Sequence, residues 1–293
     1  KKIMKLICIP AYNEEANIGK LIKDCKKFAD KVIVCDDGSI DYTSELAKKE
    51  GAIVLQHEKN QGYGSAIATL FDYSRKENAD VMVTIDADGQ HDPNEIPLLF
   101  GAIEKHKVDV AIGSRFLNDN DTPAYRKAGI KIITSATNYS TNLKVSDSQS
   151  GFRAYSNLAI NEIVPTETGM SVSTEILLKV SNKGLSLAEV PITISYDGDT
   201  STQNPVSHGT SVFATTMKYV SIRHPLLFYG LPGIILFLSG IGLGMSFIDA
   251  YLYQQQIFYG SLFGSILLIL IGAILSLAAV LLYSMANLMR DKN

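Results

Sequence analysis

Short apolar runs alternate with amphipathic stretches over roughly the first 110 residues of the chain. Predicted strands, rich in Val and Ile, lie at 5–9, 31–35, 53–57, 81–85 and 108–112. Between the first two strands, apolar residues recur at three- and four-residue spacing, which predicts a helix over 18–28 with Asn13 as its N-cap. Further helices are predicted at 39–50, 62–75 and 93–106. This alternation predicts an α/β fold with a mainly parallel sheet, covered by helices on both faces.

The pattern is less regular after residue 112. A helix is predicted near 173–183 and a strand near 187–196, and the stretch 197–208, rich in Gly, Ser, Thr, Asn and Pro, is predicted to be a loop. In the segment 206–224, apolar residues share one helical face and basic residues are present. Two interpretations stay open for this segment: an amphipathic helix at a membrane surface, and an ordinary packed helix.

Two long C-terminal segments, 226–248 and 257–285, contain no Asp, Glu, Lys or Arg. Each is long enough to cross a bilayer, which takes about 20 residues. Lys218 and Arg223 precede the pair and Arg290 and Lys292 follow it, while the intervening loop 249–256 has no basic residue. The positive-inside rule therefore predicts a hairpin with both ends in the cytosol.

These boundaries predict four parts. A catalytic-size domain covers 1–205, a juxtamembrane amphipathic segment 206–224, two transmembrane helices 225–289 and a cytosolic tail 290–293. The apolar run near the N-terminus is too short for a signal peptide, so the first domain is expected in the cytosol and the protein in the cell membrane as a multi-pass protein.

Composition narrows the class of partner. The 293 residues carry a formal charge of −3, which argues against nucleic acid as a partner, because binding to a phosphate backbone needs a basic face. The three cysteines have no metal-ligand spacing and are interpreted as core side chains in a reducing compartment.

Polar motifs follow three predicted strands at the point where each strand ends. The first strand leads into Pro-Ala-Tyr-Asn-Glu at 10–14, the second into Asp-Asp-Gly-Ser at 36–39 and the fourth into Asp-Ala-Asp-Gly-Gln-His at 86–91. Ligands of open parallel sheets bind beyond the carboxyl ends of the strands. We therefore expect the three motifs to meet at one edge of the sheet.

Asp86 and Asp88 are candidate metal ligands. Two carboxylates so close together repel each other unless a cation or solvent offsets their charge. Mg²⁺ or Mn²⁺ would offset it, since these ions bind one or two carboxylates and complete their shell with water and phosphate oxygens. An Asp-x-Asp pair in a solvated loop is the alternative, and the position directly after a strand, with Gln90 close by, favours the metal site.

Six ordered motifs together resemble a known enzyme family. The three motifs above are joined by Asn-Gln-Gly-Tyr-Gly at 60–64, Gly-Ser-Arg at 113–115 and Ser-Gly-Phe-Arg at 150–153. Their order resembles that of family 2 glycosyltransferases, specifically the branch of dolichyl-phosphate mannose synthases and polyprenyl-phosphate glycosyltransferases. The resemblance covers about residues 3–210, and it implies a nucleotide-sugar-binding fold of the GT-A type.

The resemblance also implies residue roles. The donor nucleotide would be bound by Pro10, Tyr12, Glu14, Asp37 and Asp86, and the metal ion by Asp86, Asp88 and Gln90. Structural alternatives stay open: a strand-ending turn with a packed ring for Pro10 and Tyr12, and a helix cap for Asp37. Gly62 and Gly64 fit either close approach to the donor or a helix-entry turn.

A phosphate acceptor is already largely anionic at pH 7, so it needs cations rather than a general base. Arg115, Arg126 and Arg153 are the candidates, because guanidinium forks suit phosphate oxygens. Together with Asp88 they form the predicted catalytic set, and a structural ion pair is the alternative for each arginine. Asp147 is a candidate for binding the sugar, and Glu175 and Glu189 match family positions that scaffolding explains equally well.

The expected activity is an inverting transfer of a sugar from a nucleoside-diphosphate sugar, either GDP-mannose or a UDP-sugar, to a polyprenyl phosphate such as dolichyl phosphate. The alternatives are a processive polysaccharide synthase, disfavoured by the absence of Trp, and a catalytically inactive membrane scaffold. In the mannose synthases a basic element usually follows the last strand. Here 196–202 reads Tyr-Asp-Gly-Asp-Thr-Ser-Thr and His208 is the next basic residue, so the donor sugar is left unassigned.

Overall fold

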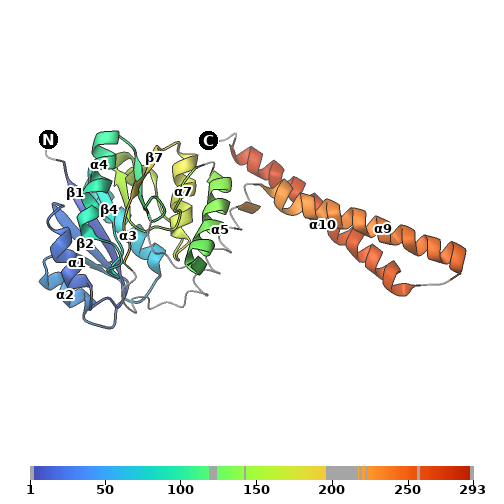
Figure 1. Cartoon of the computed structure of the whole chain (residues 1–293), viewed down its shortest axis with the longest axis horizontal. Helices are drawn as coiled ribbons and strands as arrows, with labels where there is room; N and C mark the ends of the chain where they lie inside the picture. The colour runs from blue at the N-terminus through green and yellow to red at the C-terminus, as the bar shows by residue number, and fades with distance from the viewer. Residues whose placement is uncertain are drawn as a thin grey trace. The chain divides into compact units, whose positions relative to one another are not determined.

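A computed structural model of the chain describes residues 3–118, 124–141, 143–195, 217, 220–221, 224–255 and 258–290 (Figure 1). The chain divides into two compact units, Lys1–Thr216 and Met217–Asn293, and each is described by itself. Several sequence-predicted features lie outside the described residues: the predicted loop 197–208, Lys218, Arg223, Lys292 and most of the segment 206–224.

The first unit is built on a seven-stranded sheet with the order β3-β2-β1-β4-β6-β5-β7. The strands are β1 (Lys5–Ala11), β2 (Lys31–Asp36), β3 (Ile53–Gln56), β4 (Val81–Thr84), β5 (Val110–Ser114), β6 (Arg153–Ser156) and β7 (Leu187–Pro191). All neighbouring pairs are parallel except those of β6, which runs antiparallel to β4 and to β5. The predicted α/β class and mainly parallel sheet are confirmed, and β6 is an addition that the sequence pattern did not indicate.

Alternate residues of the central strands point to opposite faces, and each face has its own apolar core. Ile7 and Ile9 of β1 pack with α1 (Ile18–Cys25), α2 (Thr43–Lys49) and α4 (Ile96–His106), the last preceded by the 3₁₀ turn η1 (Pro93–Glu95). Leu6 and Cys8 pack on the other face with α3 (Tyr63–Lys76), α6 (Asn157–Glu162) and α7 (Val172–Asn182). This two-sided burial explains why the strands are almost continuously apolar.

One expectation about the helices needs correction, and one helix is an addition. Asn13 does not cap α1: the helix begins at Ile18, and Asn13 adopts a left-handed conformation (φ 55°) in which its side-chain oxygen accepts a hydrogen bond from the Ile40 backbone N–H (3.0 Å). An additional helix, α5 (Ala124–Thr141), was not predicted. It buries hydroxyl side chains such as Thr134 and Thr137 and exposes Ile132, so it lacks an apolar inner face.

The second unit is a pair of long apolar helices. The π-helical turn η2 (Leu226–Gly230) leads into α9 (Leu231–Gln254), and α10 is Tyr259–Arg290. The spans Leu226–Tyr253 and Tyr259–Met285 are long and apolar enough to cross a membrane. The loop predicted at 249–256 is shorter in the structure, because the apolar residues after Asp249 continue the helix to Gln254.

Candidate active site

The loops that follow β1, β2 and β4 meet at one edge of the sheet, as expected from the sequence. β1 lies between β2 and β4 and runs parallel to both, so the carboxyl ends of the three strands share one edge of the sheet. Pro10 is buried near the end of β1, beside Cys35 of β2, and Tyr12 is half-buried just beyond it. The aspartates that follow β4 lie beyond the third of these strand ends.

Each carboxylate oxygen of Asp86 has a polar neighbour. Its Oδ1 accepts a hydrogen bond from the Tyr63 hydroxyl (2.9 Å), and its Oδ2 lies 3.8 Å from Nε2 of His91. Burial opposes ionisation of this carboxyl, but His91, Tyr63 and the positive charge of Arg115 outweigh it and lower the pKa of Asp86. Asp86 is therefore kept as a carboxylate at the edge of the sheet.

Asp88 and Glu14 give the same region an excess of acidic groups. Burial and the charge of Asp86 raise the pKa of Asp88. Burial raises the pKa of Glu14 to about 7, and a hydrogen bond from Asn17 opposes this while the charges of Asp88, Asp41 and Asp86 add to it. Asn17 also donates to the backbone oxygen of Asp88 (3.3 Å), which connects the loop after β1 to the loop after β4.

These groups fit a divalent cation. Two carboxylates that disfavour each other's ionisation become favourable when an ion lies between them. Within the described residues, no group of three or more His, Cys, Asp or Glu side chains could hold a metal ion. The set of Asp86, Asp88 and Gln90 thus suits an ion that takes few protein ligands and completes its shell with water or substrate oxygens, as Mg²⁺ and Mn²⁺ do.

Both carboxylate oxygens of Asp37 are engaged by other groups of the chain. Its Oδ1 accepts from the Gln61 N–H (2.9 Å) and contacts Nδ1 of His57 (2.6 Å), and its Oδ2 accepts from the Gly62 N–H (2.8 Å). Nε2 of His57 in turn contacts Oγ1 of Thr69 (2.9 Å). The carboxylate anchors the loop before α3, and it does not cap α2, whose N-cap is Tyr42.

Asp36 is a buried residue to which the sequence assigned no role. It is fully buried, its Oδ1 accepts from the Ser39 N–H (3.0 Å), and its Oδ2 has no hydrogen-bond partner among the described residues. The two consecutive aspartates at 36 and 37 were the available signal in the sequence. A sequence does not show which of the two side chains is directed into the protein. Because Asp36 has no exposed surface, its contact with the Ser39 N–H assigns it to holding the turn after β2.

Gly62 and Gly64 are required by a neighbouring loop. A Cβ on Gly62 would lie 2.4 Å from the backbone oxygen of Thr168, and one on Gly64 would lie 2.1 Å from that of Glu167. The loop is held from its other side by Glu175, whose carboxylate accepts from the N–H groups of Thr166 and Glu167. The scaffolding alternative therefore accounts for Glu175, and packing against this loop accounts for both glycines.

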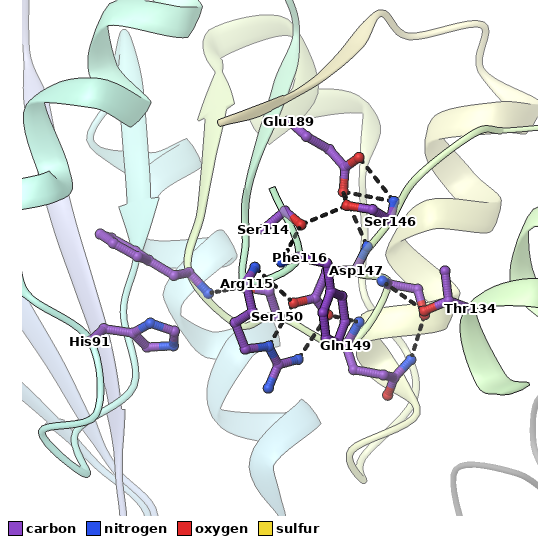
Figure 2. Close-up of polar contacts among 12 residues, drawn as sticks. His91, Ser114, Arg115, Phe116, Thr134, Ser146, Asp147, Gln149, Ser150 and Glu189 are labelled. Carbon is purple, nitrogen blue, oxygen red and sulfur yellow. Dashed lines mark hydrogen bonds and ion pairs between the residues drawn. The ribbon is translucent and has the colours of Figure 1, made fainter. Parts of the chain in front are cut away.

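Arg115 follows the last residue of β5 and pairs with a buried acid. Its Nε lies 2.6 Å from Oδ2 of Asp147 and its Nη2 lies 2.7 Å from Oδ1 (Figure 2). Asp147 has no exposed surface, so in this structure it orients the arginine and has no surface through which to bind a sugar.

Of the three candidate arginines, the structure describes the side chains of Arg115 and Arg153. Arg153 is only 2% exposed and donates to the backbone oxygens of Ser150 (2.7 Å), Ser173 (3.1 Å) and Ser148 (2.8 Å), which favours the structural alternative for this residue. Arg126 lies on α5, and its side chain is outside the described residues. The positive charge of Arg115 is among the causes that lower the pKa of Asp86.

Comparisons with known proteins give a family match and similar proteins. Residues 6–164 match the family described as Glycosyl transferase family 2. UDP-N-acetylglucosamine–dolichyl-phosphate N-acetylglucosaminyltransferase of Methanococcus voltae is 31% identical over 72% of this chain and 91% of its own length. Polyprenol monophosphomannose synthase of Mycolicibacterium smegmatis is 29% identical over 65% of this chain and 77% of its own length.

A solved structure shares the fold. Glucosyl-3-phosphoglycerate synthase of Mycobacterium tuberculosis, crystallised with Mn²⁺, UDP and glucosyl-3-phosphoglycerate, superposes with a TM-score of 0.60. The similarity covers 75% of this chain and 80% of that one, at 21% sequence identity. The same protein has also been crystallised with Mg²⁺ and UDP.

Proposed function

Since the chain belongs to glycosyltransferase family 2 and is a glycosyltransferase, we propose that it transfers a sugar from a nucleoside-diphosphate sugar to a polyprenyl phosphate. The observation that carries this proposal is the meeting of the motifs after β1, β2 and β4 at one edge of the sheet, in a chain that also has two membrane-length apolar helices. The relatives named for dolichyl or polyprenol phosphate chemistry support the same acceptor class.

The donor binds at the carboxyl ends of β1, β2 and β4. Pro10, Tyr12 and Glu14 line the nucleotide side, and Asp37 shapes it through the Gln61–Gly62 backbone. Asp86, Asp88 and Gln90 would hold Mg²⁺ or Mn²⁺, which when bound offsets the negative charge that develops on the departing diphosphate. The repulsion between the two carboxylates supports this, because the charge of Asp86 raises the pKa of Asp88.

The acceptor phosphate binds on the Arg115 side of the site, with Arg126 as a second cation. A phosphate oxygen attacks the anomeric carbon from the face opposite the nucleoside diphosphate. A new C–O bond forms, the old one breaks, and its electron pair leaves with the diphosphate, so the configuration inverts. No general base is required, because the attacking phosphate is already an anion at pH 7; alignment of the two bound reactants supplies much of the rate enhancement.

The two apolar helices anchor the enzyme as a multi-pass protein of the cell membrane, with the catalytic unit and the C-terminal tail in the cytosol. Tethering keeps the active site beside an acceptor whose phosphate lies at the membrane surface. The charge pattern around the hairpin supports this orientation.

The test is transfer of radiolabel into an organic-extractable product by membranes that contain the full chain. GDP-mannose and UDP-sugars are offered with a polyprenyl phosphate, with and without Mn²⁺. We expect one donor class to give a metal-dependent lipid product of inverted anomeric configuration, and we expect Asp88→Ala and Arg115→Ala to abolish it. Asp24→Ala, which removes a surface carboxylate on α1, is the matched control.

Two results would overturn the proposal. If Asp88→Ala and Arg115→Ala both retain full transfer, the site is wrong. If calorimetry detects metal-dependent nucleotide binding but no donor yields a lipid product, the chain is a binding scaffold without turnover.

A further inference from the structure

A chain of polar contacts connects β7 to Arg115 through a buried carboxylate. Three donors of Arg115 converge on Asp147: the backbone N–H at 3.3 Å from Oδ2, Nε at 2.6 Å from Oδ2 and Nη2 at 2.7 Å from Oδ1. Figure 2 shows Arg115 at one end of this network and Glu189 at the other, with Ser146 and Asp147 between them.

The pairing of Arg115 and Asp147 sets the direction of the guanidinium. A bidentate contact uses one edge of the planar fork and thereby fixes where the opposite edge points. Asp147 is 0% exposed, so water does not compete for its oxygens. Because a carboxylate buried this completely is costly unless it is paired, the ion pair has one strongly preferred geometry.

Glu189 fixes the position of Asp147. Both oxygens of Glu189 lie 2.9 Å from the Ser146 N–H, and Oε1 also accepts from the Ser146 hydroxyl (2.9 Å) and from the Asp147 N–H (3.1 Å). Glu189 is itself fixed by the sheet, where β7 pairs with β5 in the register Ile112↔Glu189.

A second contact closes the network on β5. The Ser146 hydroxyl lies 2.6 Å from the hydroxyl of Ser114, the last residue of β5 and the neighbour of Arg115. The loop that carries Asp147 is thus clamped both to β7 and to the strand end that carries the arginine. A shift of Glu189 would therefore move the Asp147 carboxylate relative to Arg115.

We infer that Asp147 and Glu189 are positioning residues, which act on the reaction by aiming Arg115 at the catalytic edge of the sheet. The inference rests on the proposed function for the reaction that Arg115 serves. Asp147 holds the guanidinium, and Glu189 holds the backbone that carries Asp147; neither contacts substrate.

A purely structural role for Asp147 and Glu189 predicts a different result. Asp109 provides the matched comparison, because it connects the other ends of the same two strands: its Oδ2 accepts from the Ser186 N–H (2.8 Å) and hydroxyl (2.6 Å). Asp109→Asn removes a similar carboxylate clamp far along β5 from Arg115. It is expected to lower thermal stability and to leave transfer kinetics within about 2-fold of the wild type.

The first measurement does not depend on activity. Full-length protein labelled with ¹⁵N-arginine gives an Nε–Hε signal for Arg115, assigned by its loss in Arg115→Lys. We expect slow solvent exchange for this hydrogen in the wild type, faster exchange and a shifted signal in Asp147→Asn and Glu189→Gln, and no change in Asp109→Asn.

The second measurement is a double-mutant cycle in the transfer assay. Misplacing a charged group by about 1 Å can cost about 10²-fold in rate, so Asp147→Asn is expected to lower kcat/KM for the lipid phosphate by about that factor. Glu189→Gln, at a half-buried position and of similar shape, is expected to lower it by about 10-fold. In an Arg115→Ala background both further losses should shrink to less than about 2-fold, since positioning residues have no effect without the residue they position.

The outcomes separate the two hypotheses. An unchanged Arg115 signal in both variants overturns the positioning inference, whatever the transfer assay gives. Equal kinetic losses with and without Arg115 also overturn it, because Asp147 and Glu189 would then act independently of the arginine. If the wild type transfers no sugar but the Arg115 signal responds as expected, the proposed function fails while the aiming of Arg115 by the two acids stands.

Discussion

Gly151 lies directly against the carboxylate of Asp86. A Cβ on Gly151 would be 2.5 Å from Oδ2 of Asp86 and 2.7 Å from the hydroxyl of Tyr63. The glycine therefore fixes how closely the loop before β6 approaches the proposed metal site. The Tyr63 hydroxyl, from α3, donates to the same carboxylate, so Gly151 lies against both partners of this hydrogen bond.

Gly151→Ala is expected to push Asp86 out of place. Overpacking of this kind costs about 1–3 kcal/mol, and a loss of about 1.4 kcal/mol in transition-state stabilisation corresponds to a tenfold decrease in rate. We predict that kcat/KM falls about tenfold or more and that the Mn²⁺ concentration for half-maximal transfer rises.

The control for this substitution is Gly101→Ala. Gly101 lies within α4, and a Cβ there would meet nothing within 4 Å. Alanine in a helix is favoured over glycine by about 0.5–1 kcal/mol, so this variant should unfold at a higher temperature and keep its transfer rate. A Gly151→Ala enzyme with wild-type metal dependence would contradict the role given to Asp86.

Glu14 makes the stability of the protein depend on pH. Its pKa is raised from 4.5 to about 7, so the folded chain binds a proton more tightly than the unfolded chain. Stability falls with rising pH wherever the folded state binds more protons. In metal-free buffer, the contribution of Glu14 is therefore expected to become less favourable from about pH 4.5 to about pH 7 and to stay constant above that.

Glu14→Gln removes this dependence. The unfolding temperature of the variant relative to the wild type should rise between pH 5 and pH 7 and then level off, which thermal unfolding in EDTA measures. Glu58→Gln, at an exposed position, is the control and should follow the wild type at every pH. A difference that is flat across this range would show that the Glu14 carboxyl is not protonated in the folded protein.

Metal binding should stabilise the fold through Asp88. An ion that binds the folded chain alone stabilises it by RT ln(1 + [L]/Kd), about 2.7 kcal/mol at a concentration of 100 Kd. We predict that Mn²⁺ raises the unfolding temperature of the wild type and that Asp88→Asn loses most of this increase. Asp92→Asn, in the same loop but exposed at the start of η1, should keep it. Equal shifts in all three proteins would place the ion elsewhere.

Strands whose sequences are regular apolar runs could be predicted. β6 and α5 lack such a pattern and were not predicted. The five strands before residue 115 are continuous Val- and Ile-rich runs because both of their faces are buried. β6 has only four residues and begins with the polar Arg153. α5 buries Thr134 and Thr137 while it exposes Ile132, which reverses the usual pattern.

The site was predictable in its composition but not in its contacts. The three motifs follow strands of one predicted parallel sheet, so their meeting at one edge could be foreseen. The partner of Arg115 is an aspartate 32 positions further along the chain, and no local spacing indicates it. Nor does a motif show that Arg153 faces three backbone oxygens instead of the edge of the sheet.

Gly272 is one of the glycines at which the two helices of the apolar hairpin pack closely. A Cβ on this residue would lie 2.5 Å from the backbone N of Phe237 and 2.6 Å from the backbone oxygen of Gly233. Small residues allow helix backbones to approach in a membrane, where association depends on packing and not on the hydrophobic effect. Gly272→Ala should therefore separate α9 from α10 and destabilise the hairpin by about 1–3 kcal/mol.

Gly242 supplies the matched control on α9, since a Cβ there would meet nothing within 4 Å. Gly242→Ala should leave the hairpin unchanged. Cysteines introduced at facing positions of the two helices report the separation: cross-linking by a short reagent should fall in Gly272→Ala and persist in Gly242→Ala. Persistence of the cross-link in Gly272→Ala, or its loss in Gly242→Ala, would contradict the packing assigned to these two glycines.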